Sequence, residues 1–422
     1  MTFEEKKLRA LRLLLLLLGA ALFMSHFLRY PSQVRDIHGR FAPEATLSYP
    51  SAYVLFAPFS QAADALTLLS LYQHIMFLLF LNALWLSFRV YLHWGTPQNP
   101  QKFIFELLKG AAFNLCYAAA AAAAILAPRP MASLDLRGPD ILAVDFHSHT
   151  SHSWDARRSF SPFRNLEWHR RAGFDAAFIT DHNAVSGADE AVADYERGSK
   201  SGAIPLRGEE VSLFKSHWVV LGNKSLIPNH TYDTGPEGIQ RFLADVTRST
   251  GVCVIASLPE YWQHHWADIE QLVRWGAQGF EIVNSAPIAL DFPRSKRGEV
   301  LKITERENLA RVGITDNHGW GSAAYVWNTL EIPGWRDLSR AELEEKIIQI
   351  LRDNPQGVQV WTRVKQEPGE EAWAPAADPL LQIWENARSL PALQRVIALL
   401  WISGFGWLVT LLSRSGTFRW LL

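Results

Sequence analysis

The sequence predicts an α/β protein in which a soluble domain is flanked by membrane-spanning helices. Both ends of the 422-residue chain hold long apolar runs, whereas the middle has the composition of a soluble protein. In the middle, short apolar stretches typical of buried strands alternate with helical patterns. Histidines or carboxylates follow several of these stretches, and the carboxyl ends of parallel barrel strands are where such folds build active sites.

Four apolar runs predict transmembrane helices. Three lie at about residues 13–28, 63–91 and 103–126, within an N-terminal membrane region of residues 1–133. The fourth opens the C-terminal segment 392–422, which ends in a short tail. A cleaved signal peptide is the alternative for residues 13–28, but no small-residue cleavage site follows them.

The distribution of basic residues predicts the orientation in the membrane. Lys6 and Lys7 precede the first run and Arg414 follows the last, so the positive-inside rule places residues 128–391 outside the cytoplasm. In a bacterium this predicts an inner-membrane protein with a periplasmic domain. Residues 30–61 form a polar loop that is re-entrant, interfacial or packed on the soluble domain, and the sequence does not choose among these.

Residues 140–364 predict the soluble domain, and residues 365–391 a linker to the last helix. Strands are expected at residues 141–146, 176–180, 204–206, 218–222, 252–256, 279–283, 312–315 and 329–332. Helices are expected at residues 163–172, 188–197, 236–249, 267–275, 300–311 and 341–352. Seven or eight parallel strand–helix units in about 225 residues fit a closed barrel better than an open sheet. No glycine-rich nucleotide-binding motif follows a strand.

Charge and cysteine content exclude some functions. The formal net charge of −1 argues against a nucleic-acid partner, which requires a basic surface. Cys116 and Cys253 fall in a predicted span and a predicted core strand, so no disulfide framework is expected. The predicted spans carry no chain of charged residues, which argues against transport.

Potential metal ligands stand at the strand ends. His147 and His149 form an H-x-H pair, and because alternate residues of a strand share a face, both imidazoles point to one place. A lone histidine of this kind is more often a hydrogen-bonded core residue, but several at one end of a barrel indicate a metal cluster. Imidazoles and carboxylates suit zinc, manganese or iron alike. The further candidates are Asp155, His182, Glu210, His217, Asp316 and His318.

The motifs around these residues resemble the PHP (polymerase and histidinol phosphatase) domain. In order they are D-F-H-S-H-T, I-T-D-H-N, R-G-E-E-V-S, H-W-V-V-L-G, G-F-E-I-V-N and G-I-T-D-N-H, across roughly residues 141–318. The resemblance implies a distorted (β/α)7 barrel with a cluster of two or three metals. It also implies hydrolysis of a phosphate ester by a metal-activated water.

The resemblance further implies a role for each ligand. Asp316, His318 and Glu210 are the expected catalytic residues. Three metal positions follow, with ligands His147, His149, Glu210 and Asp316 for the first, Glu210 and His217 for the second, and Asp155, His182 and His318 for the third.

One position departs from the family pattern. Leu258 stands where members usually carry a histidine ligand to the second metal, and leucine cannot bind a metal. We therefore expect two tightly bound divalent ions, with a third weak or absent. The missing ligand also keeps open a non-catalytic, metal-binding sensory domain.

Candidate substrate contacts are Arg207, Asn284 and Trp320, and Arg157 and Arg158 are further arginines that suit a phosphate. For the arginines, solvated surface charge is the commoner explanation. Asn284 could equally well hydrogen-bond a loop, and Trp320 could line the pocket or simply cover the barrel mouth. The expected substrate is a phosphorylated small molecule or a lipid-linked phosphate. A metal-dependent hydrolase of a non-phosphate bond is the alternative, since metal-bearing barrels host several chemistries. A DNA exonuclease is disfavoured by the predicted spans.

Overall fold

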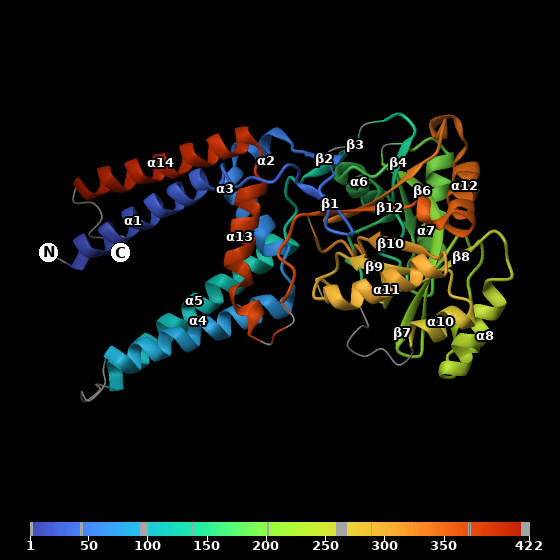
Figure 1. Cartoon of the computed structure of the whole chain (residues 1–422), viewed down its shortest axis with the longest axis horizontal. Coiled ribbons are helices and arrows are strands. Elements are labelled where there is room, and N and C mark those ends of the chain that lie inside the picture. Colours follow the sequence, from blue (N-terminus) through green and yellow to red (C-terminus); the bar gives the residue numbers. More distant parts are fainter. Residues whose placement is uncertain are drawn as a thin grey trace.

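The computed structural model describes residues 3–42, 45–92, 100–136, 138–200, 202–258, 268–287, 289–321, 323–369, 371 and 373–414. A curled sheet with helices on its outer side forms one half of the molecule (Figure 1). Long helices extend from the sheet in the other half (Figure 1).

In the part of the chain that the structure describes, ten strands form one mixed sheet in the order β1-β12-β11-β4-β5-β6-β7-β8-β9-β10. A separate two-stranded sheet pairs β2 with β3. The predicted α/β class is confirmed, but the ladder is open and holds more strands than the predicted (β/α)7 barrel. The strand bounds are β1 Val34–Asp36, β2 Ala45–Ser48, β3 Ser133–Leu136, β4 Ile141–Asp145, β5 Ala176–Ile179, β6 Ile204–Leu213, β7 Ser216–Leu221, β8 Cys253–Ala256, β9 Gly279–Asn284, β10 Ala310–Ile314, β11 Val326–Glu331 and β12 Gln359–Arg363.

The strand directions differ from the purely parallel arrangement expected. Strands β4 to β6 and β8 to β10 run parallel, but β7 pairs antiparallel with both β6 and β8. Only Phe214 and Lys215, at φ 24° and 55°, connect β6 to β7, and so short a connection makes a hairpin rather than a crossover. Strand β11 is antiparallel to β4 and to β12.

The sheet curls until β10 approaches β4 and β11. Beyond the strands, Ser148 and Asn317 form a parallel bridge that joins the two ends of the curl. The fully buried Asn328 of β11 bonds across the remaining gap: its amide donates to Val144 O and Gly313 O and accepts from Gly313 N. Gly313 allows this approach, since a Cβ there would lie 2.1 Å from the Val326 side chain. The curl thus brings the carboxyl ends of β4 and β10 together.

Among the described residues between Pro162 and Asp353, six α-helices cover the outer side of the sheet. Ser161 and Ser339 cap two of them by accepting a hydrogen bond from the backbone N–H of Arg164 and Glu342. The apolar faces of the helices pack on the strands and complete the core, in which Trp218, Phe242 and Phe280 are fully buried. The bounds are α6 Pro162–Ala172, α7 Ser186–Glu196, α8 Pro236–Val246, α10 Ile269–Trp275, α11 Arg294–Arg306 and α12 Arg340–Asp353.

Three helices, not four, are long and apolar enough to cross a membrane among the described residues. They are α4 (Leu71–Leu92), α5 (Pro100–Leu126) and α14 (Ala392–Arg414). Helix α1 (Phe3–Met24) does not qualify, because only about twelve residues, or roughly 18 Å, separate Arg12 from its end. It lies beside α14 instead, with Leu22 packed against Ala398 (Figure 1).

The predicted span 63–91 is divided in two. Helix α3 (Ala57–Thr67) ends early, and Ser70 caps a new helix, α4, by exchanging hydrogen bonds with Gln73. The shorter helices α2 (Ser51–Leu55) and α13 (Asp378–Ser389) lie with α3 at the base of the long helices (Figure 1).

Part of the segment 30–61 joins the sheet. Strand β1 pairs antiparallel with β12, with Arg35 opposite Thr362. A buried ion network joins α3 to β12, the partner of β1: Asp64 of α3 binds Arg129 and also Arg363, whose Nη1 lies 2.5 Å from the Asp64 carboxylate. Of the three alternatives for residues 30–61, packing on the soluble domain is therefore the one that the structure shows for β1.

Candidate metal centre

The first group of ligands surrounds the H-x-H pair. The Nε2 atoms of His147 and His149 lie 3.0 Å apart, and both residues are fully buried. Asp316 Oδ1 lies 3.1 Å from His149 Nε2, and Glu210 Oε2 lies 3.1 Å from His147 Nε2 and 3.2 Å from His149 Nε2. The four side chains implied for the first metal thus face one another.

The second group contains Glu210, His217 and His182. Glu210 Oε1 lies 2.8 Å from His217 Nδ1, and Glu210 Oε2 lies 3.1 Å from His182 Nδ1. The three side chains offer ligand atoms within 4.8 Å of one another. His182 was expected only at the third position, and here its Nδ1 supplies a donor to the group that Leu258 leaves short.

The third group forms at the outer end of the cluster. Asp155 Oδ2 lies 3.3 Å from His182 Nε2 and 3.1 Å from His318 Nε2. This third group overlaps with the first, since the rings of His149 and His318 stack with their centroids 4.0 Å apart. His182 therefore lies between two candidate metal positions and presents a different nitrogen to each.

Hydrogen bonding in the cluster fits a bound cation. Both carboxylate oxygens of Glu210 are buried, and neither accepts a hydrogen bond of good geometry from the described residues, although four imidazoles surround them. Buried polar atoms are nearly always paired in folded proteins, so such atoms call for an explanation. Imidazole nitrogens and carboxylate oxygens that face one another at about 3 Å form a donor set for a divalent ion.

The backbone is strained at two points of this site. Asp316 and Asn183, which follow β10 and β5, both have φ of 48°, in the left-handed region that few residues other than glycine adopt. Strain of this kind tends to gather at functional sites. At Asp316 it accompanies a carboxylate that faces His149.

A second layer of side chains holds the ligands, and its main member was missed in the sequence. Glu281 Oε1 lies 2.7 Å from His147 Nδ1, and Ser257 Oγ donates to Glu281 Oε2 at 2.6 Å. A carboxylate behind a histidine ligand is the usual way to fix its ring and its tautomer. The signal was a glutamate in the middle of the apolar stretch G-F-E-I-V-N, where only Asn284 was singled out. Ser153 Oγ makes the corresponding contact with His149 Nδ1 at 3.0 Å.

Buried charge shifts the protonation of the centre. Burial alone would lower the pKa of His147, but the carboxylates of Glu210, Glu281 and Asp316 outweigh it and raise that pKa well above its ordinary value. Burial raises the pKa of Glu281 to about 7, against the opposing effect of His147. Divalent ions would therefore compete with protons here, so metal binding should release protons and weaken in acid.

The three candidate substrate residues lie in different places. Asn284 Nδ2 donates to Asp316 Oδ2 at 3.1 Å, so its amide holds a predicted ligand. Trp320 is 44% exposed beside the centre, and its indole N–H points to Asp155 O at 3.4 Å. Arg207 is not brought to the cluster, because its guanidinium pairs with Asp189 of α7 at 3.1 Å.

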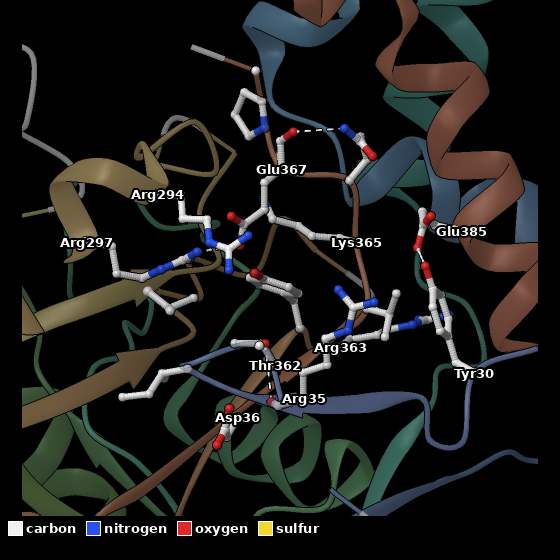
Figure 2. Close-up of a pocket in the computed structure, with 18 residues that line it drawn as sticks. Tyr30, Arg35, Asp36, Arg294, Arg297, Thr362, Arg363, Lys365, Glu367 and Glu385 are labelled. Carbon is white, nitrogen blue, oxygen red and sulfur yellow. Dashed lines mark hydrogen bonds and ion pairs between the residues drawn. The ribbon is translucent and has the colours of Figure 1, made fainter. Parts of the chain in front are cut away.

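A separate polar cavity of about 580 Å³ lies between β1, β12 and α11, and contains none of the eight predicted ligands (Figure 2). Most of its cations are already paired. Arg297 binds Glu367 at 2.5 Å, Arg363 binds Asp64, and Lys365 donates to Leu290 O. Because these cations are bonded to neighbouring parts of the chain, their role is structural.

No family model and no curated protein matches the chain. Among solved structures, a metal-dependent phosphoesterase of Bifidobacterium adolescentis is 17% identical, with a TM-score of 0.35 over 42% of this chain and 88% of that one. An amidohydrolase from Chromobacterium violaceum is 17% identical, with a TM-score of 0.32 over 48% and 96%. PsfC from Pseudomonas syringae is 16% identical, with a TM-score of 0.37 over 58% and 97%. At these TM-scores the likenesses carry no conclusion about what this chain does.

Proposed function

We propose that the chain is a membrane-anchored, metal-dependent hydrolase that cleaves phosphate esters. The observation that carries the proposal is the buried cluster, in which three overlapping triads each place their ligand atoms within 4.8 Å of one another. The triads are His147, His149 and Asp316; His182, Glu210 and His217; and His149, His182 and His318. Divalent ions held there would polarise a phosphate oxygen and acidify a water molecule. Two ions, of zinc, manganese or iron, are proposed to bind tightly.

The residues of the chain would divide the work of binding and positioning. His147, His149, Glu210 and Asp316 would hold one ion, and Asp155, His182 and His318 the other, which leaves Glu210 and His217 as the weak position. Glu281 fixes the orientation of His147, and Asn284 that of Asp316. His318 Nε2 lies 3.1 Å from the Asp155 carboxylate at the outer end of the cluster, where these two side chains would present their ion to a bound ester.

The proposed anchors are α4, α5 and α14, with α1 alongside α14. The long helices point away from the sheet on one side (Figure 1). Basic residues lie near their far tips: Arg9 in α1, Arg89 in α4 and Arg414 in α14. By the positive-inside rule we infer that those tips face the cytoplasm and that the sheet and the cluster lie on the other side of the membrane. In a bacterium that side of the inner membrane is the periplasm.

The test uses the full chain, because residues 140–364 alone would lack β1 and expose the edge of β12. Hydrolysis of p-nitrophenyl phosphate and of its bis-ester is measured with manganese, zinc and iron in turn. His147→Ala removes a ligand, and His152→Ala is the matched control, because His152 pairs with Glu190 at 2.9 Å and lies outside the cluster.

We expect metal-dependent turnover that His147→Ala abolishes and His152→Ala retains. Equal turnover in the parent chain and His147→Ala would refute the cluster as the active centre. Metal binding without turnover of either ester would favour a hydrolase of another bond or a metal-binding sensor.

A further inference from the structure

A second cavity, of about 360 Å³, lies between α6, the loop after β10 and the end of α5. Four arginines and one glutamate line it, which leaves an excess of three positive charges. They are Arg129, Arg157, Arg164, Arg171 and Glu167. We call this cavity the basic pocket.

Three of these arginines are not neutralised. Among the described residues, none of Arg157, Arg164 and Arg171 has a carboxylate within ion-pair distance, whereas Arg129 pairs with Asp64. Arg164 donates to a neutral acceptor, Ser159 O, at 3.1 Å. Arg157 lies over the ring of Trp320, 5.6 Å from its centre. The cations of the cavity in Figure 2 differ, since Arg297 and Arg363 there bind carboxylates (Figure 2). Uncompensated arginines around a cavity attract an anion.

Trp168 supplies an independent sign of a ligand. It lines the basic pocket and is only 6% exposed, yet its buried indole N–H has no hydrogen-bond acceptor among the described residues. Buried donors are nearly always satisfied, and this one lies in the wall of the pocket, so a small movement of the ring on binding would bring the N–H to an acceptor in the cavity. Trp168 stands four residues after Arg164 and three before Arg171, a spacing that puts all three on one face of α6.

The position of the basic pocket links the metal centre to the proposed membrane anchor. Arg157 N donates to His318 O at 2.9 Å, and Gly319 lines the pocket next to that histidine. Leu126, the last residue of α5, lines the opposite side together with Met131. A ligand bound here would therefore touch both the loop of the cluster and the end of a candidate span.

We propose that the basic pocket binds a phosphate group, carried either by an anionic lipid or by a soluble phosphate. The planar forks of Arg157, Arg164 and Arg171 suit phosphate oxygens, and the Trp168 N–H adds a neutral donor. The apolar side chains of Leu126 and Met131 favour an acyl chain beside the phosphate. This binding requires neither the metal ions nor the proposed hydrolysis.

The test measures binding to the full chain, stripped of metal by a chelator and held in a non-ionic detergent. Dihexanoyl phosphatidic acid and inorganic phosphate are titrated separately by calorimetry. The binding variants are Arg157→Gln with Arg171→Gln, and Trp168→Phe. The matched controls are Arg158→Gln with Arg170→Gln, which remove the same charge from adjacent exposed positions that do not line the pocket.

We expect saturable binding of the lipid that the double arginine variant weakens at least tenfold and Trp168→Phe weakens about threefold. The control pair should change it less than twofold. Inorganic phosphate binding as tightly as the lipid would assign the pocket to soluble phosphates, and preference for the lipid would assign it to a headgroup. The proposal is overturned if neither probe saturates, or if the control pair weakens binding as much as the pocket variants. A parent chain that binds the lipid or phosphate in this pocket but hydrolyses neither ester would instead refute only the proposed hydrolase.

Discussion

Glu281 should control the metal affinity of the centre although it is not itself an expected ligand. It is fully buried and receives two donors, the ring nitrogen Nδ1 of His147 at 2.7 Å and the hydroxyl of Ser257 at 2.6 Å. Glu281→Gln keeps the volume, and its amide oxygen can still accept from His147 while its NH2 group donates to the hydroxyl oxygen of Ser257. The substitution therefore acts by removing the negative charge that strengthens His147 as a ligand.

Loss of such a partner typically weakens metal binding 10- to 100-fold, or about 1.4–2.7 kcal/mol. The assay is zinc titration of the full chain against a competing chelator at neutral pH. Ser257→Ala should weaken zinc binding only a few-fold, because Glu281 keeps its contact with His147.

Glu209→Gln is the matched control, since Glu209 is also fully buried but bonds Asn223 and the backbone of Ile227 rather than a histidine. Its zinc affinity should equal that of the parent chain. Unchanged affinity in Glu281→Gln, or an equal loss in Glu209→Gln, would show that Glu281 does not act through His147.

Three other predictions concern metal content and stability. Elemental analysis of the purified full chain should return two divalent ions, and three would contradict the weak position expected from Leu258. Burial raises the pKa of Glu209 to about 7 from 4.5, so its contribution to stability is full below pH 4.5 and is lost as the pH rises to 7. Between pH 4.5 and 8, the free energy of unfolding of Glu209→Gln should rise by up to about 3 kcal/mol relative to that of the parent chain, as measured by thermal unfolding. If the free energies of unfolding of the two proteins change in parallel with pH, the raised pKa of Glu209 is refuted. Asn328→Leu leaves backbone groups of Gly313 and Val144 unpaired and should destabilise the fold by about 3 kcal/mol, with an unchanged melting temperature as the contrary result.

Much of the site follows from the positions of polar residues along the chain. Apolar strand patterns end at His147, His182 and Asp316, and the ends of neighbouring parallel strands meet at one edge of a sheet. That rule does not depend on whether the sheet closes, so the ligands converge even though the ladder is open. Arg207 shows the limit of the rule: it stands three residues before Glu210, and its side chain pairs with α7 instead.

The residues of a strand do not indicate its direction in the sheet or which distant segment pairs with it. A three-residue strand such as Val34–Asp36 is too short to show alternation, and its partner β12 lies at the other end of the soluble domain. The break between α3 and α4 depends on a single cap at Ser70, inside a run that is otherwise apolar enough for one span. The span predicted at residues 13–28 was too long, because the apolar residues continue past Met24, where α1 ends.

The pairing of β1 with β12 also sets the order in which the protein can be built. Thr362 contacts Arg35 across 327 residues of sequence, so β1 leaves the ribosome long before its partner exists. At about 5–20 residues per second, that delay is roughly 16–65 s, during which the first helices can insert. Pairing so distant in sequence is slow to form, and the edge of the sheet should be the last part of the domain to become ordered. Until then β12 presents a free edge to other chains, so a chaperone is most useful at this late stage of biogenesis.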